Sequence, residues 1–209
     1  MTRTRRLLVV LLLNLALVAA LITVGITAHS VAVFAEGGDY LLDAAAVGVA
    51  LVAARIAVRH REQERPGESK ATTIAALVNA GWLLLLELIV AGVAIDRLVR
   101  HTPRVDGLPV LVVSGVAALA MAAGALILRG DPGDEGEEGR DPSVAAVLLD
   151  TIADASAAAG VAIAGAIILA AGRWFWLDPA VALAVAVIFG CHAAALATRA
   201  FAPLRTGAQ

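Results

Sequence analysis

Apolar residues gather in six long runs along the chain, separated by short polar or charged stretches. Each run is close to or longer than the ~20 residues that an α-helix needs to cross the hydrocarbon core of a bilayer. No run shows the alternation of apolar and polar residues that is typical of a half-buried strand. The pattern predicts an all-α integral membrane protein with six transmembrane helices, at residues 7–27, 31–58, 73–96, 108–128, 144–171 and 177–198.

Composition agrees with this pattern. The 209 residues are 60% hydrophobic and 16% charged, with a mean hydropathy of +0.87. Soluble domains contain fewer apolar and more charged residues. The run at 7–27 follows a basic start but is long enough to span and lacks a small-residue cleavage site, so we interpret it as a helix and not as a signal peptide. We expect a single transmembrane domain over 1–209, with no soluble domain after the last helix.

The distribution of positive charge predicts the orientation. Most Lys and Arg residues fall on the side that holds the N-terminus, and the exceptions are Arg97, Arg100, Arg104 and Arg173. Positively charged loops stay in the cytoplasm, so we expect both termini there. The expected location is the inner cell membrane, which the chain crosses several times.

The connections carry their own signals. Residues 28–30 are too few for anything but a tight turn, whereas residues 131–141 form an acidic, glycine-rich loop that we expect to be flexible. Asp178 and Pro179 are typical of an N-cap followed by proline at the first helical position. The single cysteine, Cys191, excludes an intrachain disulfide and a metal site built from paired cysteines.

Four aspartates lie where charge is unfavourable. Asp150 and Asp154 interrupt one apolar run, and Asp39 and Asp43 repeat the same spacing in another. Inserting one carboxylate into hydrocarbon costs about 3 kcal/mol, and such residues are normally functional. Residues at i and i+4 share a helix face, so two such helices can present four carboxylates to one point. These carboxylates repel one another unless a cation or protons neutralise them. The pairs predict a cation site within the membrane.

Three further polar residues are candidates for accessory roles. Helical geometry places Glu36 and His29 on the same stripe as Asp39, which suggests a path towards the outside. His29 is also readily explained as an interfacial loop residue. Glu87 lies in the third run and is either a proton carrier or a protonated group that bonds to a neighbouring helix.

Several stretches resemble one transporter family, the cation diffusion facilitators. Residues 30–43, with the sequence SVAVFAEGGDYLLD, resemble its second-helix signature, and residues 174–179, WFWLDP, resemble its turn before the sixth helix. Residues 75–79, AALVN, resemble the start of its third helix. The resemblance covers essentially the whole chain. It implies a homodimeric transporter that exports divalent transition metals from the cytoplasm in exchange for protons.

The chain also departs from that family's usual pattern. Members often have histidine at the first position of a pair, whereas this chain has Asp39 and Asp150. Many continue into a cytoplasmic metal-binding domain, which we do not expect here. Four oxygen ligands suit harder ions such as Mn²⁺, although carboxylates also bind Zn²⁺. The expected substrates are therefore Zn²⁺ or Mn²⁺, with Cd²⁺, Co²⁺ and Fe²⁺ as further candidates.

Two other classes of protein fit part of the pattern. An intramembrane aspartyl protease also uses membrane-buried aspartates, but it needs one from each of two helices, and here each helix carries a pair. A membrane subunit that binds a metal without transporting it is the second alternative. We favour the transporter, which is not an enzyme. Its expected partners are the lipid bilayer and a second copy of the chain, with no role for nucleic acid.

Overall fold

The computed structural model describes residues 3–42, 44–45, 68–100, 102–129 and 142–206. In this part of the chain a helix covers residues 31–42, here called the 31–42 helix, and residues 44 and 45 are also helical. The other helices are α1 (Arg3–Thr27), α3 (Glu68–Val99), α4 (Gly107–Arg129), α5 (Pro142–Ala171) and α6 (Leu177–Thr206). These described residues contain no strand, which confirms the predicted all-α fold.

The helices begin and end close to the predicted positions. Both α3 and α6 continue beyond their apolar runs, to Glu68 at the start of α3 and Thr206 at the end of α6. Hydropathy marks only the segment in hydrocarbon, whereas backbone hydrogen bonding can continue among the polar headgroups. The predicted second span runs to residue 58, and its part after residue 45 lies outside the described residues.

Three helices are long and apolar enough to cross a bilayer within the described residues. The spanning segments are Gly107–Leu126 in α4, Thr151–Ala171 in α5 and Leu177–Ala195 in α6. Many large apolar side chains on α3, α4 and α6 are exposed, among them Trp82, Leu119 and Ile188. An outer surface of this kind needs lipid around it, so the chain is an integral membrane protein.

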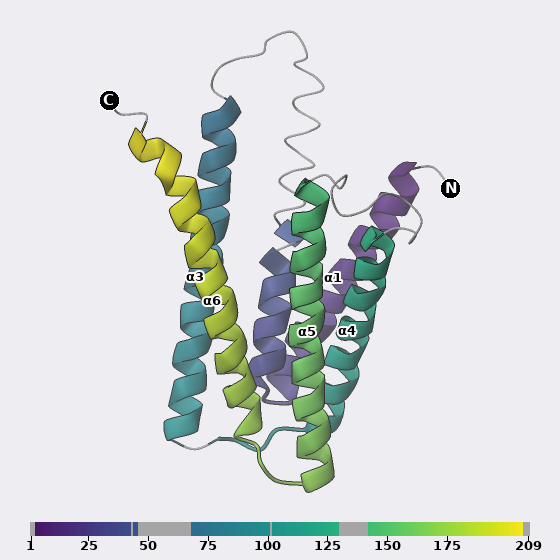
Figure 1. Ribbon diagram of the computed structural model, residues 1–209. Coiled ribbons are helices and arrows are strands. Elements are labelled where there is room, and N and C mark those ends of the chain that lie inside the picture. The colour runs from purple at the N-terminus through teal and green to yellow at the C-terminus, as the bar shows by residue number, and fades with distance from the viewer. Residues whose placement is uncertain (1–2, 43, 46–67, 101, 130–141, 207–209) are drawn as a thin grey trace.

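The helices form two groups (Figure 1). α3 packs along α6, and α4 packs along α5, with α1 against α4. The contact between α5 and α6 is less extensive. The 31–42 helix lies between the groups, with Gly37 against Leu21 and Ile22 of α1 and Gly38 against Leu86 of α3. α1 begins and α6 ends at the same end of the bundle (Figure 1). We call the opposite end, with residues 28–30, 102–106 and 172–176, the turn end.

Glycine allows the backbones of α4 and α5 to come close together. A Cβ added at Gly165 would lie 2.7 Å from the Leu111 backbone nitrogen, and one at Gly107 would lie 2.6 Å from the Gly165 carbonyl oxygen. Small residues permit such approaches between membrane helices, where van der Waals packing is a main source of association. The pairing of α4 with α5 therefore depends on the absence of side chains here.

Replacing Gly165 by alanine is expected to separate α4 from α5. The added methyl group meets backbone atoms that cannot rotate away, and overpacking of this kind costs about 1–3 kcal/mol. The thermal unfolding midpoint in detergent should fall. Gly160→Ala on the same helix is the control, because nothing lies within 4 Å of its added Cβ. An equal midpoint for the two variants would contradict the close-approach argument.

Candidate metal centre

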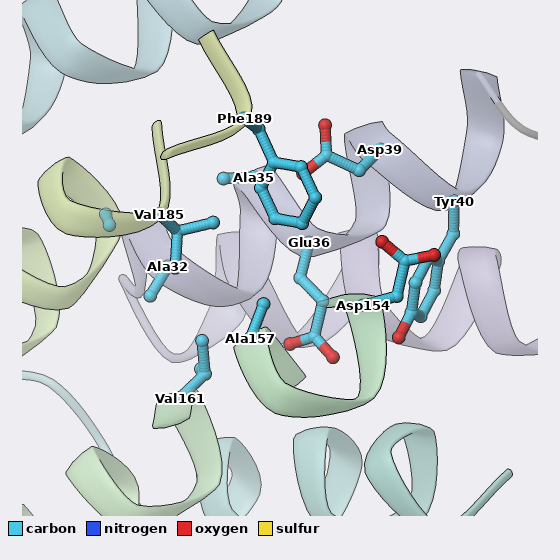
Figure 2. A pocket seen from close by; sticks show the side chains of 11 residues that line it. Ala32, Ala35, Glu36, Asp39, Tyr40, Asp154, Ala157, Val161, Val185 and Phe189 are labelled. Atoms are coloured by element: carbon cyan, nitrogen blue, oxygen red, sulfur yellow. The ribbon is translucent and has the colours of Figure 1, made fainter. Parts of the chain in front are cut away.

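A small cavity lies where the 31–42 helix, α5 and α6 meet (Figure 2). Its volume of ≈ 20 Å³ is enough for one water-sized species. The carboxylates of Glu36, Asp39 and Asp154 contribute to its lining, as does Tyr40. The remaining lining residues are apolar: Ala32, Ala35, Ala157, Val161, Ala182, Val185 and Phe189. Small side chains on three helices thus leave a space the size of one ion, with acidic groups at its wall.

Asp39 and Asp154 come from the two different aspartate pairs and line the same cavity. Both side chains are half-buried. Asp150 lies in α5 one helical turn before Asp154, but its side chain is outside the part that the structure describes, as is the whole of Asp43. The structure therefore brings together one member of each predicted pair. Among the described residues no three His, Cys, Asp or Glu side chains converge closely enough to hold an ion.

Glu36 is anchored to α4. Its side chain is 6% exposed, and Oε2 accepts a hydrogen bond of 2.7 Å from the Ser114 hydroxyl. Its other oxygen, Oε1, has no donor among the described residues. The carboxylates of Glu36 and Asp39 point to opposite sides of the 31–42 helix in Figure 2. Glu36 thus joins the cavity wall from the side of α4, whereas the carboxylate of Asp39 points the other way, although the prediction put both residues on one stripe.

The start of the 31–42 helix is held by hydrogen bonds at the turn end. The Ser30 hydroxyl oxygen caps this helix by accepting a hydrogen bond of 3.1 Å from the Val33 N–H. The same hydroxyl donates to Asp178 Oδ1, and the Val31 N–H donates to Asp178 Oδ2 at 2.8 Å. One orphan N–H of the helix start and the hydroxyl of its capping serine are therefore satisfied by a carboxylate of α6.

This arrangement corrects the role predicted for Asp178. We expected Asp178 to cap its own helix, but α6 begins at Leu177, so Asp178 lies inside the first turn. Its carboxylate is 1% exposed and caps the 31–42 helix instead. A local sequence pattern shows that a residue can cap a helix, but not which helix start its side chain reaches in the folded protein.

His29 ends α1 in a left-handed conformation, with φ of 57°. The Ser30 N–H bonds to the Gly25 carbonyl and the His29 N–H to the Ile26 carbonyl, which together form a Schellman motif. The His29 carbonyl accepts a hydrogen bond from the Arg97 guanidinium of α3. The His29 side chain is exposed. This is the position of a loop residue, as in the alternative considered for His29, and His29 is not among the residues that line the cavity.

Glu87 is not among the residues that line the cavity, yet it lies near Asp39. Its side chain is 3% exposed on α3, and its carboxylate is close enough to interact with that of Asp39. The sequence identified Glu87 as an isolated polar residue but could not predict its neighbour. Sequence reasoning missed Ser114 and Tyr40. Ser114 had a signal, because it is the only hydroxyl residue in α4.

Comparisons with known proteins point to one family. A sequence model of the cation efflux transmembrane domain matches residues 7–204. The zinc transporter ZitB of Pectobacterium atrosepticum is 33% identical over 186 residues, which cover 88% of this chain and 56% of that protein.

Two further relatives agree. ZitB of Escherichia coli is 29% identical over 170 residues, covering 78% of this chain and 50% of that protein. The cadmium, cobalt and zinc/H(+)-K(+) antiporter of Bacillus velezensis is 27% identical over 167 residues, covering 78% of this chain and 51% of that protein. The chain thus spans about half the length of the curated relatives that it matches.

Asp178→Ala is expected to lower stability more than a change at a surface acidic residue. The substitution removes the acceptor of the Ser30 hydroxyl and the Val31 N–H, and both donors are buried. Leaving buried donors unpaired lowers the free energy of unfolding by about 2 kcal/mol or more. The control is Asp96→Ala, because Asp96 pairs with Arg100 at the surface and such pairs contribute only about 0–1 kcal/mol. Thermal unfolding in detergent measures both. Equal midpoints would show that the cap does not stabilise the bundle.

Proposed function

This chain belongs to the cation efflux transmembrane-domain family, and from that premise we propose that it exports divalent transition-metal cations from the cytoplasm in exchange for protons. The observation that carries the proposal is the cavity that Asp39 and Asp154 both line, because it combines ion-sized space with carboxylates from two helices. The relatives are named as transporters of zinc or of cadmium, cobalt and zinc.

The proposed binding site consists of Asp39, Asp43, Asp150 and Asp154. Asp39 and Asp154 line one cavity, and in the sequence Asp43 follows Asp39 by four residues and Asp150 precedes Asp154 by four, which is the spacing of about one helical turn. Carboxylates in a low-dielectric site cannot all stay ionised without a cation. A metal ion that binds therefore displaces protons, and protons that bind displace the metal. This competition supplies the exchange, and one relative is itself named as an antiporter.

The two groups of helices supply a means of alternating access. The cavity has walls from α5 on one side and α6 on the other, and α5 and α6 contact each other less than α4 contacts α5. In the proposed cycle the α3–α6 pair moves relative to the other helices and opens the site to either side in turn. We place the termini in the cytoplasm on the basis of the positive charges, with the turn end outside.

The proposal also covers the setting of the site. We place the protein in the inner cell membrane, as one homodimer subunit in which the described region acts as a transmembrane domain. The relatives are bacterial, and the exposed apolar surfaces of the helices suit contact with lipid or with a second copy. Chemical cross-linking in membranes tests the dimer.

The cavity favours transport over proteolysis. An aspartyl protease must admit a peptide backbone between its two aspartates, whereas ≈ 20 Å³ admits one ion or one water.

A subunit that only stores metal is distinguished from a transporter by the measurement of metal flux. The purified full chain is reconstituted in proteoliposomes, an outward or inward pH gradient is imposed, and Zn²⁺ movement is followed with an enclosed fluorescent indicator. Zn²⁺ binding without movement would support the storage role and contradict the proposal.

Asp39→Asn and Asp154→Asn are each expected to reduce the initial rate of Zn²⁺ transport at least tenfold. The amide keeps the shape of the side chain but removes the charge that compensates the cation. Asp96→Asn serves as the matched control, because Asp96 is an exposed α3 residue paired with Arg100, and its variant should transport at the parent rate. Normal transport by either site variant would remove that aspartate from the proposed site.

Selectivity gives a further prediction. Imidazole is a softer donor than carboxylate and favours Zn²⁺ over Mn²⁺. Asp150→His should therefore shift the preference towards Zn²⁺ by on the order of 1 kcal/mol, or about fivefold. Competitive transport of the two ions by the parent and the variant measures this shift. A parent that already excludes Mn²⁺ would show that site size or helix packing sets the selectivity, and not donor softness.

A further inference from the structure

Glu87 is a buried carboxylate that the proposed four-aspartate site does not use. It lies in an apolar stretch of α3, between Leu86 and Leu88, and its side chain is 3% exposed. Neither of its carboxylate oxygens has an N–H or hydroxyl donor among the described residues. Buried polar groups are nearly always hydrogen-bonded, and a charged group inside a membrane protein usually marks an ion or proton pathway. Glu87 therefore needs either a proton shared with the neighbouring carboxyl group of Asp39 or a cation to offset its lost hydration.

The surroundings of Glu87 direct it towards the 31–42 helix. On one side, Gly190 of α6 faces its Cβ, and a Cβ added at Gly190 would lie 3.6 Å away. The preceding residue, Leu86, packs against Gly38. The Glu87 carboxylate itself faces the carboxylate of Asp39. The Glu36 carboxylate is hydrogen-bonded to α4. In Figure 2 the Asp39 carboxylate points away from it.

We propose that Glu87 is a further metal-coordinating residue of this transporter, which shares a divalent cation with Asp39. The inference rests on the proposed transport function and extends it to α3. Two facing carboxylates repel strongly in a medium of low dielectric constant, and a divalent cation between them converts the repulsion into attraction. Asp39 can serve as a ligand both in the cavity and beside Glu87, because it lines the cavity together with Asp154 and also faces Glu87.

The shared cation would lie beside the cavity and nearer to the α3–α6 pair. Glu87 and Asp39 supply only oxygen ligands, and two carboxylates leave part of the coordination shell to water, as in many sites for harder divalent ions. Asp39 then serves as the ligand that an ion keeps while it exchanges Asp154 for Glu87. A helix outside the four-aspartate set thus contributes to the metal pathway.

Metal binding by the purified full chain in detergent tests this role. Zn²⁺ alone and Mn²⁺ alone are titrated calorimetrically into the parent, Glu87→Gln and Asp96→Asn. Glu87→Gln should lower the affinity at least tenfold for Mn²⁺ and less for Zn²⁺, because Mn²⁺ depends more on oxygen ligands. Asp96→Asn removes an exposed charge from the same helix and should leave both affinities within twofold.

A second readout separates coordination from packing. Glutamine has nearly the shape of glutamate and can donate to Asp39, so Glu87→Gln should unfold at the parent's midpoint or higher without metal. The rise in midpoint on adding Mn²⁺ should be smaller than for the parent. Glu87→Asp keeps the charge on a shorter side chain and should retain more Mn²⁺ affinity than Glu87→Gln does. If the glutamine variant does not fold, the Mn²⁺ affinity of Glu87→Asp is compared with that of the parent instead.

The outcomes distinguish the two proposals. Equal metal affinities and equal metal-induced midpoint shifts for Glu87→Gln and the parent, in a parent that transports Zn²⁺, would overturn the role of Glu87 and leave the transport function standing. A parent that neither binds nor moves metal would overturn both. Loss of Mn²⁺ affinity in Glu87→Asp equal to that in Glu87→Gln would also count against coordination by the carboxylate.

Discussion

The unfavourable free energy of carboxylates among apolar helices determines how this bundle is arranged. Glu36, Asp39, Glu87 and Asp154 lie in or against segments where water is scarce, and each must offset its lost hydration. The Ser114 hydroxyl replaces water at one oxygen of Glu36, to which it donates a hydrogen bond. The cavity leaves room for one water-sized species beside the acidic groups of its wall.

The position of Asp39 depends on hydrogen bonds at the start of its helix. Asp39 belongs to a helix whose start is fixed by Ser30 and by Asp178 of α6. Arg97 of α3 bonds to the carbonyl of His29 in the preceding turn. These contacts set the axial position of the 31–42 helix, and a shift of one residue would turn Asp39 away from Asp154. The turn end thus fixes the position of Asp39 along the bundle.

The helices themselves could be predicted because hydrocarbon imposes length and apolarity on every span. The i, i+4 spacing and the family resemblance singled out Asp39 and Asp154, which line one cavity, and their role as metal ligands stays a prediction. The neighbour of Glu87 and the target of Asp178 could not be predicted. Each depends on the rotation and axial position of one helix against another, and an almost uniformly apolar helix such as α3 carries little sequence information about which face turns inward.

The pairing of α3 with α6 has a consequence for how the protein is made (Figure 1). Synthesis delivers helices in chain order, so α4 and α5 can associate as soon as both are in the bilayer. α3 must wait for the last helix, and until then the cavity lacks the wall that carries Val185 and Phe189. The acidic side chains of the earlier helices therefore enter the membrane before their enclosure exists. Membrane insertion therefore ends with the closing of this cavity, and until α6 has docked, Asp39 and Asp154 lack the helix that encloses them.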